Sequence, residues 1–259
     1  MKKIIVFIGI GLLFTSCIPT KDLTYFQGEP KNKTTIHSLQ NKPYKLQVND
    51  IVDIQIKATN ENLVALFKVV ETSSATVITP EKIYFSSYSV DKNGMIRIPY
   101  LGELNVLGYT EKEVRLKIET ELAKIFKNMN DLFVTVKLAG IRYTVIGEVK
   151  KPGTSVLFQN QVNIIEAIAN AGDITLTGNR HNIKIIRNNV DGVKKYTLDL
   201  TNFDFMHSEA YYIQPNDIIY IEPLKEKSWG TGDTGAKTFS TIVAALSLIT
   251  TTILLIKNL

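Results

Sequence analysis

The segment Leu46-Gln-Val-Asn-Asp-Ile-Val-Asp-Ile54 decides the fold, because a close copy, Ile213-Gln-Pro-Asn-Asp-Ile-Ile-Tyr-Ile221, returns near the end of the chain. The two segments agree at five of nine positions. In both, the Asn-Asp pair predicts a turn, since an Asp side chain can accept hydrogen bonds from nearby backbone N–H groups. The alternating apolar residues that follow predict a buried strand. We therefore expect two units, each with one such turn, centred on Asp50 and Asp217.

The first expected unit covers residues 44–139. Strand patterns lie at 44–48, 51–56, 88–90, 96–98, 104–107 and 132–138. The third and fourth of these strands are expected to form a hairpin, because Gly94 in the turn between them tolerates positive φ, and Pro99 ends the second strand. Thr110 followed by Glu113 is a capping box that predicts the start of a helix. This content predicts a small domain of mixed α and β structure.

The second expected unit covers residues 140–224. Strand patterns lie at 141–146, 183–187, 196–200 and 218–221. Tight turns are expected at Gly147, Glu148, Pro152 and Gly153. Asn163 with Glu166 predicts a capped short helix, and Gly172 stands where the helix end needs a left-handed residue. This order of elements is typical of a β-grasp, a sheet curled around one helix.

Composition excludes several classes of protein. The chain has 259 residues, of which 44% are hydrophobic and 21% charged, so neither a disordered chain nor a polytopic membrane protein is expected. The net charge of +5 is scattered, which argues against a nucleic-acid binder. One cysteine and three dispersed histidines give no disulfide, no metal ligand set and no Cys/His or Ser/His arrangement. We therefore expect no cofactor, no metal and no catalytic residue.

The N-terminus is typical of an exported lipoprotein. Residues 1–16 combine two lysines, an apolar run of eleven residues and small residues, which is the pattern of a secretory signal peptide. The single cysteine, Cys17, follows directly and resembles the lipidated cysteine of a bacterial lipobox. A free cysteine beside an ordinary signal peptide is the alternative. Residues 17–43 are polar, with several Pro and Gly, and are expected to form a tether.

The C-terminus holds a second apolar segment. After a polar, glycine-rich linker at 225–238, residues 239–256 carry no charge, and as a helix they would extend about 27 Å, so a transmembrane helix is expected at 239–257. One face of this helix collects the small residues Ser240, Ala244, Ser247 and Thr251. The face either lines a water-filled pore, or its hydroxyls bond back to the carbonyls of the same helix in a simple anchor.

Four segments carry a resemblance to a known family. They are Tyr44-Lys-Leu-Gln-Val-Asn-Asp-Ile51, Val90-Asp-Lys-Asn-Gly-Met-Ile-Arg-Ile-Pro-Tyr-Leu-Gly102, Val145-Ile-Gly-Glu-Val-Lys-Lys-Pro-Gly153 and Glu166-Ala-Ile-Ala-Asn-Ala-Gly172. The first two resemble the polysaccharide export domain, and the last two resemble the soluble-ligand-binding β-grasp (SLBB) domain that follows it in outer-membrane polysaccharide export lipoproteins. The resemblance implies an α+β fold: a small α/β export domain, a β-grasp domain and a C-terminal transmembrane helix.

The resemblance also implies a function. Such proteins form a homo-oligomeric ring, usually of eight subunits, whose C-terminal helices line an α-helical pore for a capsular polysaccharide or exopolysaccharide. The chain would be lipid-anchored in the outer membrane, with its soluble domains in the periplasm and an inner-membrane polysaccharide co-polymerase as partner. Asn49 and Asp173 replace glycines of the family pattern, and only one β-grasp unit is evident.

A tethered carbohydrate-binding receptor or scaffold, with the C-terminal helix as a simple anchor, is the alternative function. Aromatic residues that could stack on sugar rings, or merely pack in strands, are Tyr84, Tyr88, Tyr100, Tyr211 and Tyr212. An enzyme is the least favoured class, because paired carboxylates such as Asp50 and Asp53 are explained by turns.

Overall fold

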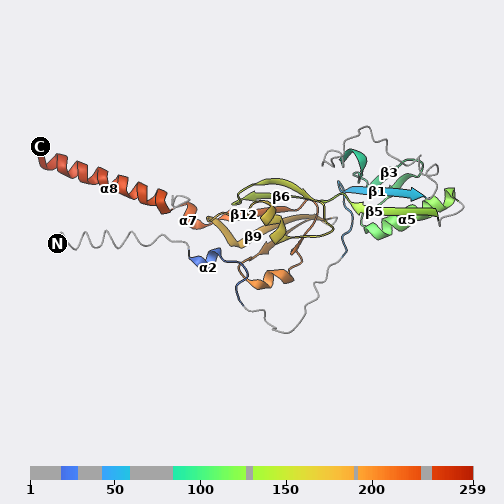
Figure 1. Ribbon diagram of the computed structural model, residues 1–259, viewed down its shortest axis with the longest axis horizontal. Helices are drawn as coiled ribbons and strands as arrows, with labels where there is room; N and C mark the ends of the chain where they lie inside the picture. The colour runs from blue at the N-terminus through green and yellow to red at the C-terminus, as the bar shows by residue number, and fades with distance from the viewer. Residues whose placement is uncertain are drawn as a thin grey trace.

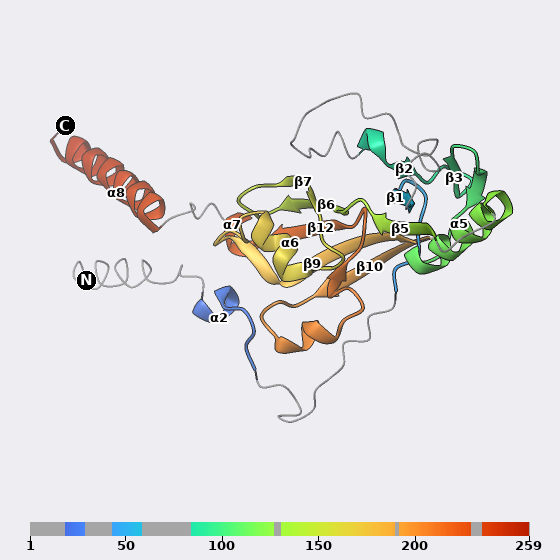
Figure 2. The same ribbon diagram turned by 45° about the vertical axis from the view of Figure 1, so that its right-hand side comes forward.

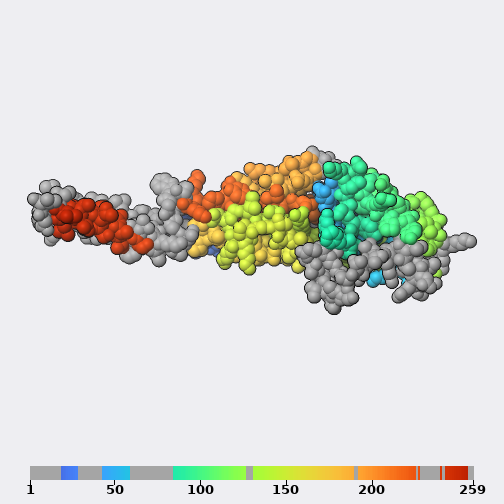
Figure 3. Space-filling model, turned by 90° about the horizontal axis from the view of Figure 1, so that it is seen from above, coloured from blue at the N-terminus to red at the C-terminus, as the bar shows by residue number. Residues whose placement is uncertain are grey.

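The computed structural model describes residues 19–28, 43–58, 84–126, 131–189, 192–228 and 235–258. These residues form two units of mixed α and β structure, each around its own hydrophobic core (Figures 1 and 2). The two units touch end to end, and the C-terminal helix extends from the far side of the second unit (Figures 1 and 3). The expected signal peptide, Cys17 and most of the tether lie outside the described residues.

The first unit is built on a three-stranded antiparallel sheet. Strand β1 (Ile51–Ala58) is central and pairs with β2 (Tyr88–Ser89) on one side and β5 (Leu132–Leu138) on the other. Helix α5 (Glu111–Ile125) packs against β5. The apolar positions of α5 recur at helical spacing, so one face of the helix is buried in the core with alternate residues of β1 and β5.

A capping box fixes the start of α5. The Thr110 hydroxyl accepts the N–H of Glu113, and the Glu113 carboxylate accepts the N–H of Thr110 at 2.7 Å. Two N–H groups that the helix itself leaves without partners are thus satisfied, as the sequence predicts.

The hairpin expected between 88–90 and 96–98 is wrong. Strand β2 pairs with β1, whereas β3 (Met95–Ile98) pairs with β4 (Gly102–Asn105). The turn itself forms, since the Asp91 carboxylate accepts the N–H groups of Asn93 and Met95, both at 2.8 Å, and the Asp91 N–H donates to the carbonyl of Met95 at 2.9 Å. Beyond this turn, β2 is paired with β1, and β3 is paired with β4. The segment 44–48, expected to be a strand, joins none of the described sheets, although Leu46 exchanges backbone hydrogen bonds with Gly108 and Tyr109.

The second unit holds a five-stranded mixed sheet in the order β10-β9-β12-β6-β7. Its strands are β6 (Ile141–Gly147), β7 (Gly153–Leu157), β9 (Gly178–Asn189), β10 (Gly192–Leu198) and β12 (Ile218–Pro223). Strands β12 and β6 are parallel, and every other pairing is antiparallel. Helix α6 (Ile164–Asn170) begins at a second capping box and buries its apolar residues in the core of this unit.

Two smaller pairings complete the second unit. Strand β8 (Val162–Asn163) leads into α6 and pairs with β11 (Tyr212–Ile213). A 3-10 helix (Phe203–His207) follows β10 and places Phe205 in the core. Near the N-terminus, the short helix α2 (Thr20–Leu23) lies beside β9 of this unit, far away in sequence (Figure 2).

The chain ends in two helices, α7 (Lys225–Ser228) and α8 (Gly235–Asn258). The large apolar side chains that the structure describes on α8 are exposed, for example Leu246 at 50% and Ile249 at 53%. Within the described part of the chain, no helix has both the length and the apolar character required to cross a membrane. The transmembrane helix expected at 239–257 is therefore not supported here.

Candidate functional site

The two Asn-Asp turns have the same geometry. Asn49 and Asn216 both adopt the left-handed region, with φ of 69° and 65°, and the next residue in each turn is a buried aspartate. The Asp50 carboxylate accepts the N–H of Gln47 at 2.7 Å, and the Asp217 carboxylate accepts the N–H of Gln214 at 2.9 Å. Each aspartate therefore stabilises its own turn from within, which is what the repeated sequence predicts.

In the second turn, a buried arginine donates hydrogen bonds to both oxygens of the aspartate carboxylate. The guanidinium of Arg187, on β9, donates to both carboxylate oxygens of Asp217, the shortest contact being 2.8 Å. Their side chains are only 3% and 0% exposed. Burial raises the pKa of Asp217, and the hydrogen bonds and charge of Arg187 oppose this rise. The same arginine donates to the carbonyl of Tyr212 at 2.8 Å, so it also secures β11.

In the first turn, only one of the two aspartate carboxylate oxygens accepts hydrogen bonds. Tyr44 donates its hydroxyl to Oδ2 of Asp50 at 2.7 Å, the same oxygen that accepts the Gln47 N–H. The other oxygen, Oδ1, is buried and accepts no hydrogen bond from the described residues. Burial raises the pKa of Asp50 to about 6, although the bonds from Gln47 and Tyr44 oppose the rise.

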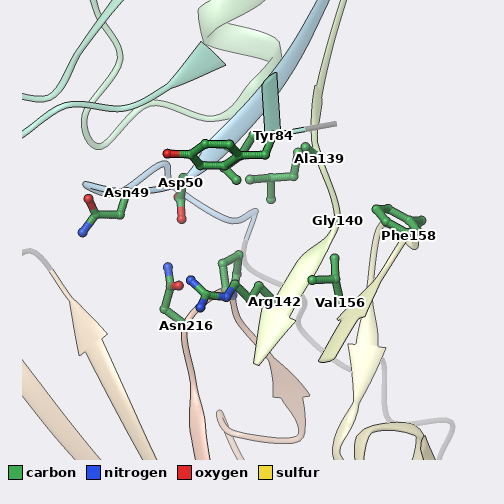
Figure 4. A pocket seen from close by; sticks show the side chains of 12 residues that line it. Asn49, Asp50, Tyr84, Ala139, Gly140, Arg142, Val156, Phe158 and Asn216 are labelled. Carbon is green, nitrogen blue, oxygen red and sulfur yellow. The ribbon is translucent and has the colours of Figure 1, made fainter. Parts of the chain in front are cut away.

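A pocket lies where the two units meet, and both turns line it. Asn49 and Asp50 contribute from the first unit, and Arg142 and Asn216 contribute from the second (Figure 4). In Figure 4, the Asp50 carboxylate and the side chains of Arg142 and Asn216 point into a common space. Apolar and aromatic groups form the remaining walls, among them Tyr84, Val156, Phe158 and Pro215. Sequence reasoning named Asp50 and Tyr84 but missed Arg142 and Asn216, because only the contact between the units unites them.

Glu148 secures the beginning of the C-terminal segment. Its carboxylate accepts the hydroxyls of Thr175 and Thr177 at 2.8 and 2.7 Å, and it pairs with Lys227 of α7 at 2.6 Å. Partial burial would raise the pKa of Glu148, but the hydrogen bonds from Lys227 and the threonines outweigh it and lower the pKa. The arrangement is structural: it ties α7 to the second unit.

The remaining turn residues occupy backbone conformations that explain their identity. Gly94, Gly147 and Gly172 have φ of 78°, 95° and 80°, and Gly153 has φ of 151°. Gly147 is the most constrained, because a Cβ there would lie 2.0 Å from the carbonyl oxygen of Ile221. Pro99 begins the connection between β3 and β4, and Pro152 directly precedes β7.

On α8, the small residues singled out from the sequence are exposed together with the apolar ones. Ser240, Ala244, Ser247 and Thr251 all lie on the surface of the helix. The Ser247 hydroxyl donates to the carbonyl of Ala244 at 2.8 Å, and the Thr251 hydroxyl donates to the carbonyl of Ser247 at 2.7 Å. These hydroxyl protons are used within the helix, while the oxygen lone pairs remain able to accept hydrogen bonds.

An N-terminal strap, residues 19–28, packs on the second unit and was not foreseen from the sequence. The N–H of Phe26 donates to the carbonyl of Leu200 at 3.2 Å, and the Tyr25 hydroxyl donates to Asp173 at 2.5 Å. His181 on β9 holds the start of the strap, as its two ring nitrogens lie 3.2 Å from carboxylate oxygens of Asp22 and Asp199. No motif marks these contacts, because the partners are about 150 residues apart.

Comparison with known families identifies the class of protein. The model of the polysaccharide biosynthesis/export protein family matches residues 38–139, and the SLBB domain model matches residues 142–221. The chain therefore carries a polysaccharide export domain followed by an SLBB domain.

Curated relatives carry the same description. The chain is similar to the "EPS I polysaccharide export outer membrane protein EpsA" of Ralstonia solanacearum, with 30% identity over 220 residues, covering 79% of this chain and 55% of the relative. It is also similar to the protein of that name from Ralstonia nicotianae, with 36% identity over 119 residues, covering 44% of this chain and 29% of the relative. The chain thus spans about half the length, or less, of these relatives.

Proposed function

We propose that the chain is a subunit of an outer-membrane translocon through which an extracellular or capsular polysaccharide leaves the cell. The observation that carries this proposal is the order of the two matched domains, followed by a helix whose described apolar side chains are exposed. The chain would be lipidated at Cys17, with its two units in the periplasm, and an inner-membrane co-polymerase would deliver the polymer.

A ring of subunits explains the two faces of α8. Leu246, Ile249 and Ile253 are each at least half exposed in the single chain, which is unfavourable for an apolar face in water. In a closed ring, these residues would face lipid or neighbouring helices, while Ser240, Ala244, Ser247 and Thr251 would face a water-filled lumen. The hydroxyl oxygens of Ser247 and Thr251 would keep lone pairs available to water and sugar hydroxyls.

Cell-based export tests the main function. Deletion of the gene is expected to abolish the extracellular polysaccharide, and the wild-type chain is expected to restore it. The polymer is measured as total carbohydrate released into the medium and retained at the cell surface. Unchanged polysaccharide in the deletion strain would reject the proposed function.

Single cysteines on α8 test the pore. Cysteines replacing Ala244, Ser247 or Thr251 are expected to react with a membrane-impermeant maleimide in whole cells, whereas cysteines replacing Leu246 or Ile249 are expected to resist. The bonds within the helix from Ser247 and Thr251 also suit a simple anchor, which is the alternative of a tethered receptor. An anchor surrounded by lipid would protect all five positions alike.

A further inference from the structure

The pocket between the two units contains polar groups that the fold leaves without partners. Oδ1 of Asp50 is buried and accepts no hydrogen bond, although the residue is only 2% exposed. Within the described part of the chain, the side chains of Arg142, Asn49 and Asn216 also form no hydrogen bond or ion pair. A buried acceptor without a partner is costly, and native proteins contain few of them.

The second turn shows that this deficit is not a requirement of the turn itself. Asp217 occupies the same position in its turn as Asp50 does, and it has both carboxylate oxygens bonded to Arg187. In the first unit, Tyr44 and Gln47 bind one oxygen of Asp50 and leave the other without a partner, in a residue that lines the pocket. The free acceptor therefore distinguishes the pocket from the purely structural turn.

The chemistry of the lining selects a hydroxylated, uncharged ligand. A sugar hydroxyl can donate to the carboxylate of Asp50 and accept from the guanidinium of Arg142 or the amide of Asn216. The apolar face of a pyranose ring can pack on the walls formed by Tyr84 and Phe158. Asp50 would repel a small anion, and Arg142 would repel a small cation. The presence of both charges therefore favours neither kind of ion. Pockets with apolar walls and a few convergent polar groups are typical binding sites.

We propose that this pocket binds a neutral hexopyranose unit of the polysaccharide, with its hydroxyls between Asp50 and Arg142 and its ring against Tyr84. The proposal rests on the chain handling a polysaccharide, and it adds a place on each subunit where that polymer makes contact. One such site per subunit would guide the chain of sugars past the junction of the two units.

Binding to purified protein tests the proposal. The full chain in detergent is titrated with maltotetraose, cellotetraose, mannotetraose and β-1,4-galactotetraose, and also with tetragalacturonate, and saturation-transfer NMR reports contact. At least one neutral tetrasaccharide is expected to bind with a millimolar dissociation constant. Arg142→Ala and Asn216→Gly are each expected to weaken this binding by about tenfold. Glycine retains the positive φ at position 216 while removing the amide.

Arg97→Ala is the matched control, because Arg97 is an exposed arginine on β3 and does not line the pocket. It is expected to bind like the wild type. The proposal is overturned if no neutral tetrasaccharide binds, if only tetragalacturonate binds, or if binding survives both pocket variants. The assay uses purified protein, whereas export is measured in cells, so failure of the pocket and failure of the export function are distinguishable.

Discussion

At the scale of the residue, the buried aspartates of the two turns show how one motif acquires different properties. Asp217 is neutralised by Arg187, while Asp50 has only neutral donors, the Gln47 N–H and the Tyr44 hydroxyl. Neutral donors offset less of the cost of burying a carboxylate than a guanidinium does. Ionisation of Asp50 therefore opposes folding, with no cationic partner to offset its cost.

The free energy of unfolding is expected to depend on pH through the ionisation of Asp50. Because the folded-state pKa of Asp50 is raised to about 6, its contribution to stability is fully present below the unfolded pKa, near 4, and is lost as the pH rises through 6. Asp50→Asn should remove this loss, so the variant should gain stability relative to the wild type between pH 4.5 and pH 7.5. Urea unfolding at the two pH values measures the difference. A constant difference between the two proteins would show that Asp50 does not titrate in this range.

A glycine at the end of β6 is expected to be irreplaceable. Gly147→Ala would place a Cβ 2.0 Å from the Ile221 carbonyl oxygen at a φ of 95°, so the parallel pairing of β6 and β12 must distort. We expect a loss of about 2–4 kcal/mol in the free energy of unfolding. Gly192→Ala is the control, since its φ is also positive but no atom lies within 4 Å of the added Cβ. Equal losses in the two variants would assign the effect to φ alone.

At the scale of the element, short segments at both ends are tied to the second unit by polar contacts. Glu148 ties α7 through Lys227, and His181 ties α2 through Asp22. Both contacts lie on the same unit, so the segments leading to the two chain ends start from one body. Partly exposed ion pairs of this kind contribute little stability.

The strap is expected to hold more firmly at low pH. Partial burial would lower the pKa of His181, but the hydrogen bonds to Asp199 and Asp22 outweigh it and raise the pKa. The contribution is therefore present below the unfolded pKa of about 6.5 and is lost as the pH rises through the higher folded value. Hydrogen exchange at the N–H of Phe26, corrected for its intrinsic pH dependence, should show falling protection between pH 5.5 and 8.5.

His181→Gln is the matched variant for this experiment, since glutamine keeps hydrogen-bonding capacity without titrating. Its protection should not vary with pH over the same interval. If the variant and the wild type lose protection in parallel, another group controls the strap, and the role of His181 is disproved.

At the scale of the whole molecule, two packed units meet at a pocket and carry an exposed helix at one end (Figure 1). The units have separate cores, so each can fold around its own apolar residues. Among the described residues, neither core includes α8, and association with further copies would bury its apolar face.

Removal of the helix is therefore expected to change the assembly. The full chain in detergent should form a closed oligomer, visible as rings by electron microscopy, whereas a chain ending at Ser228 should form smaller species by light scattering. The shortened chain should keep the unfolding transition of the two units, because neither core includes residues of α8. A full chain that remains monomeric in detergent would contradict the ring.

The sequence by itself determined the features that depend on neighbours along the chain. The capping boxes at Thr110 and Asn163, the Asn-Asp turns and the α+β class follow from local hydrogen bonding and from the spacing of apolar residues. Tertiary structure alone decided which aspartate received an arginine, where the N-terminal strap packs, and that β3 pairs with β4 and not with β2. The physical reason is that these contacts depend on which distant segments meet, and the hydrophobic packing that brings them together leaves no short-range mark in the sequence.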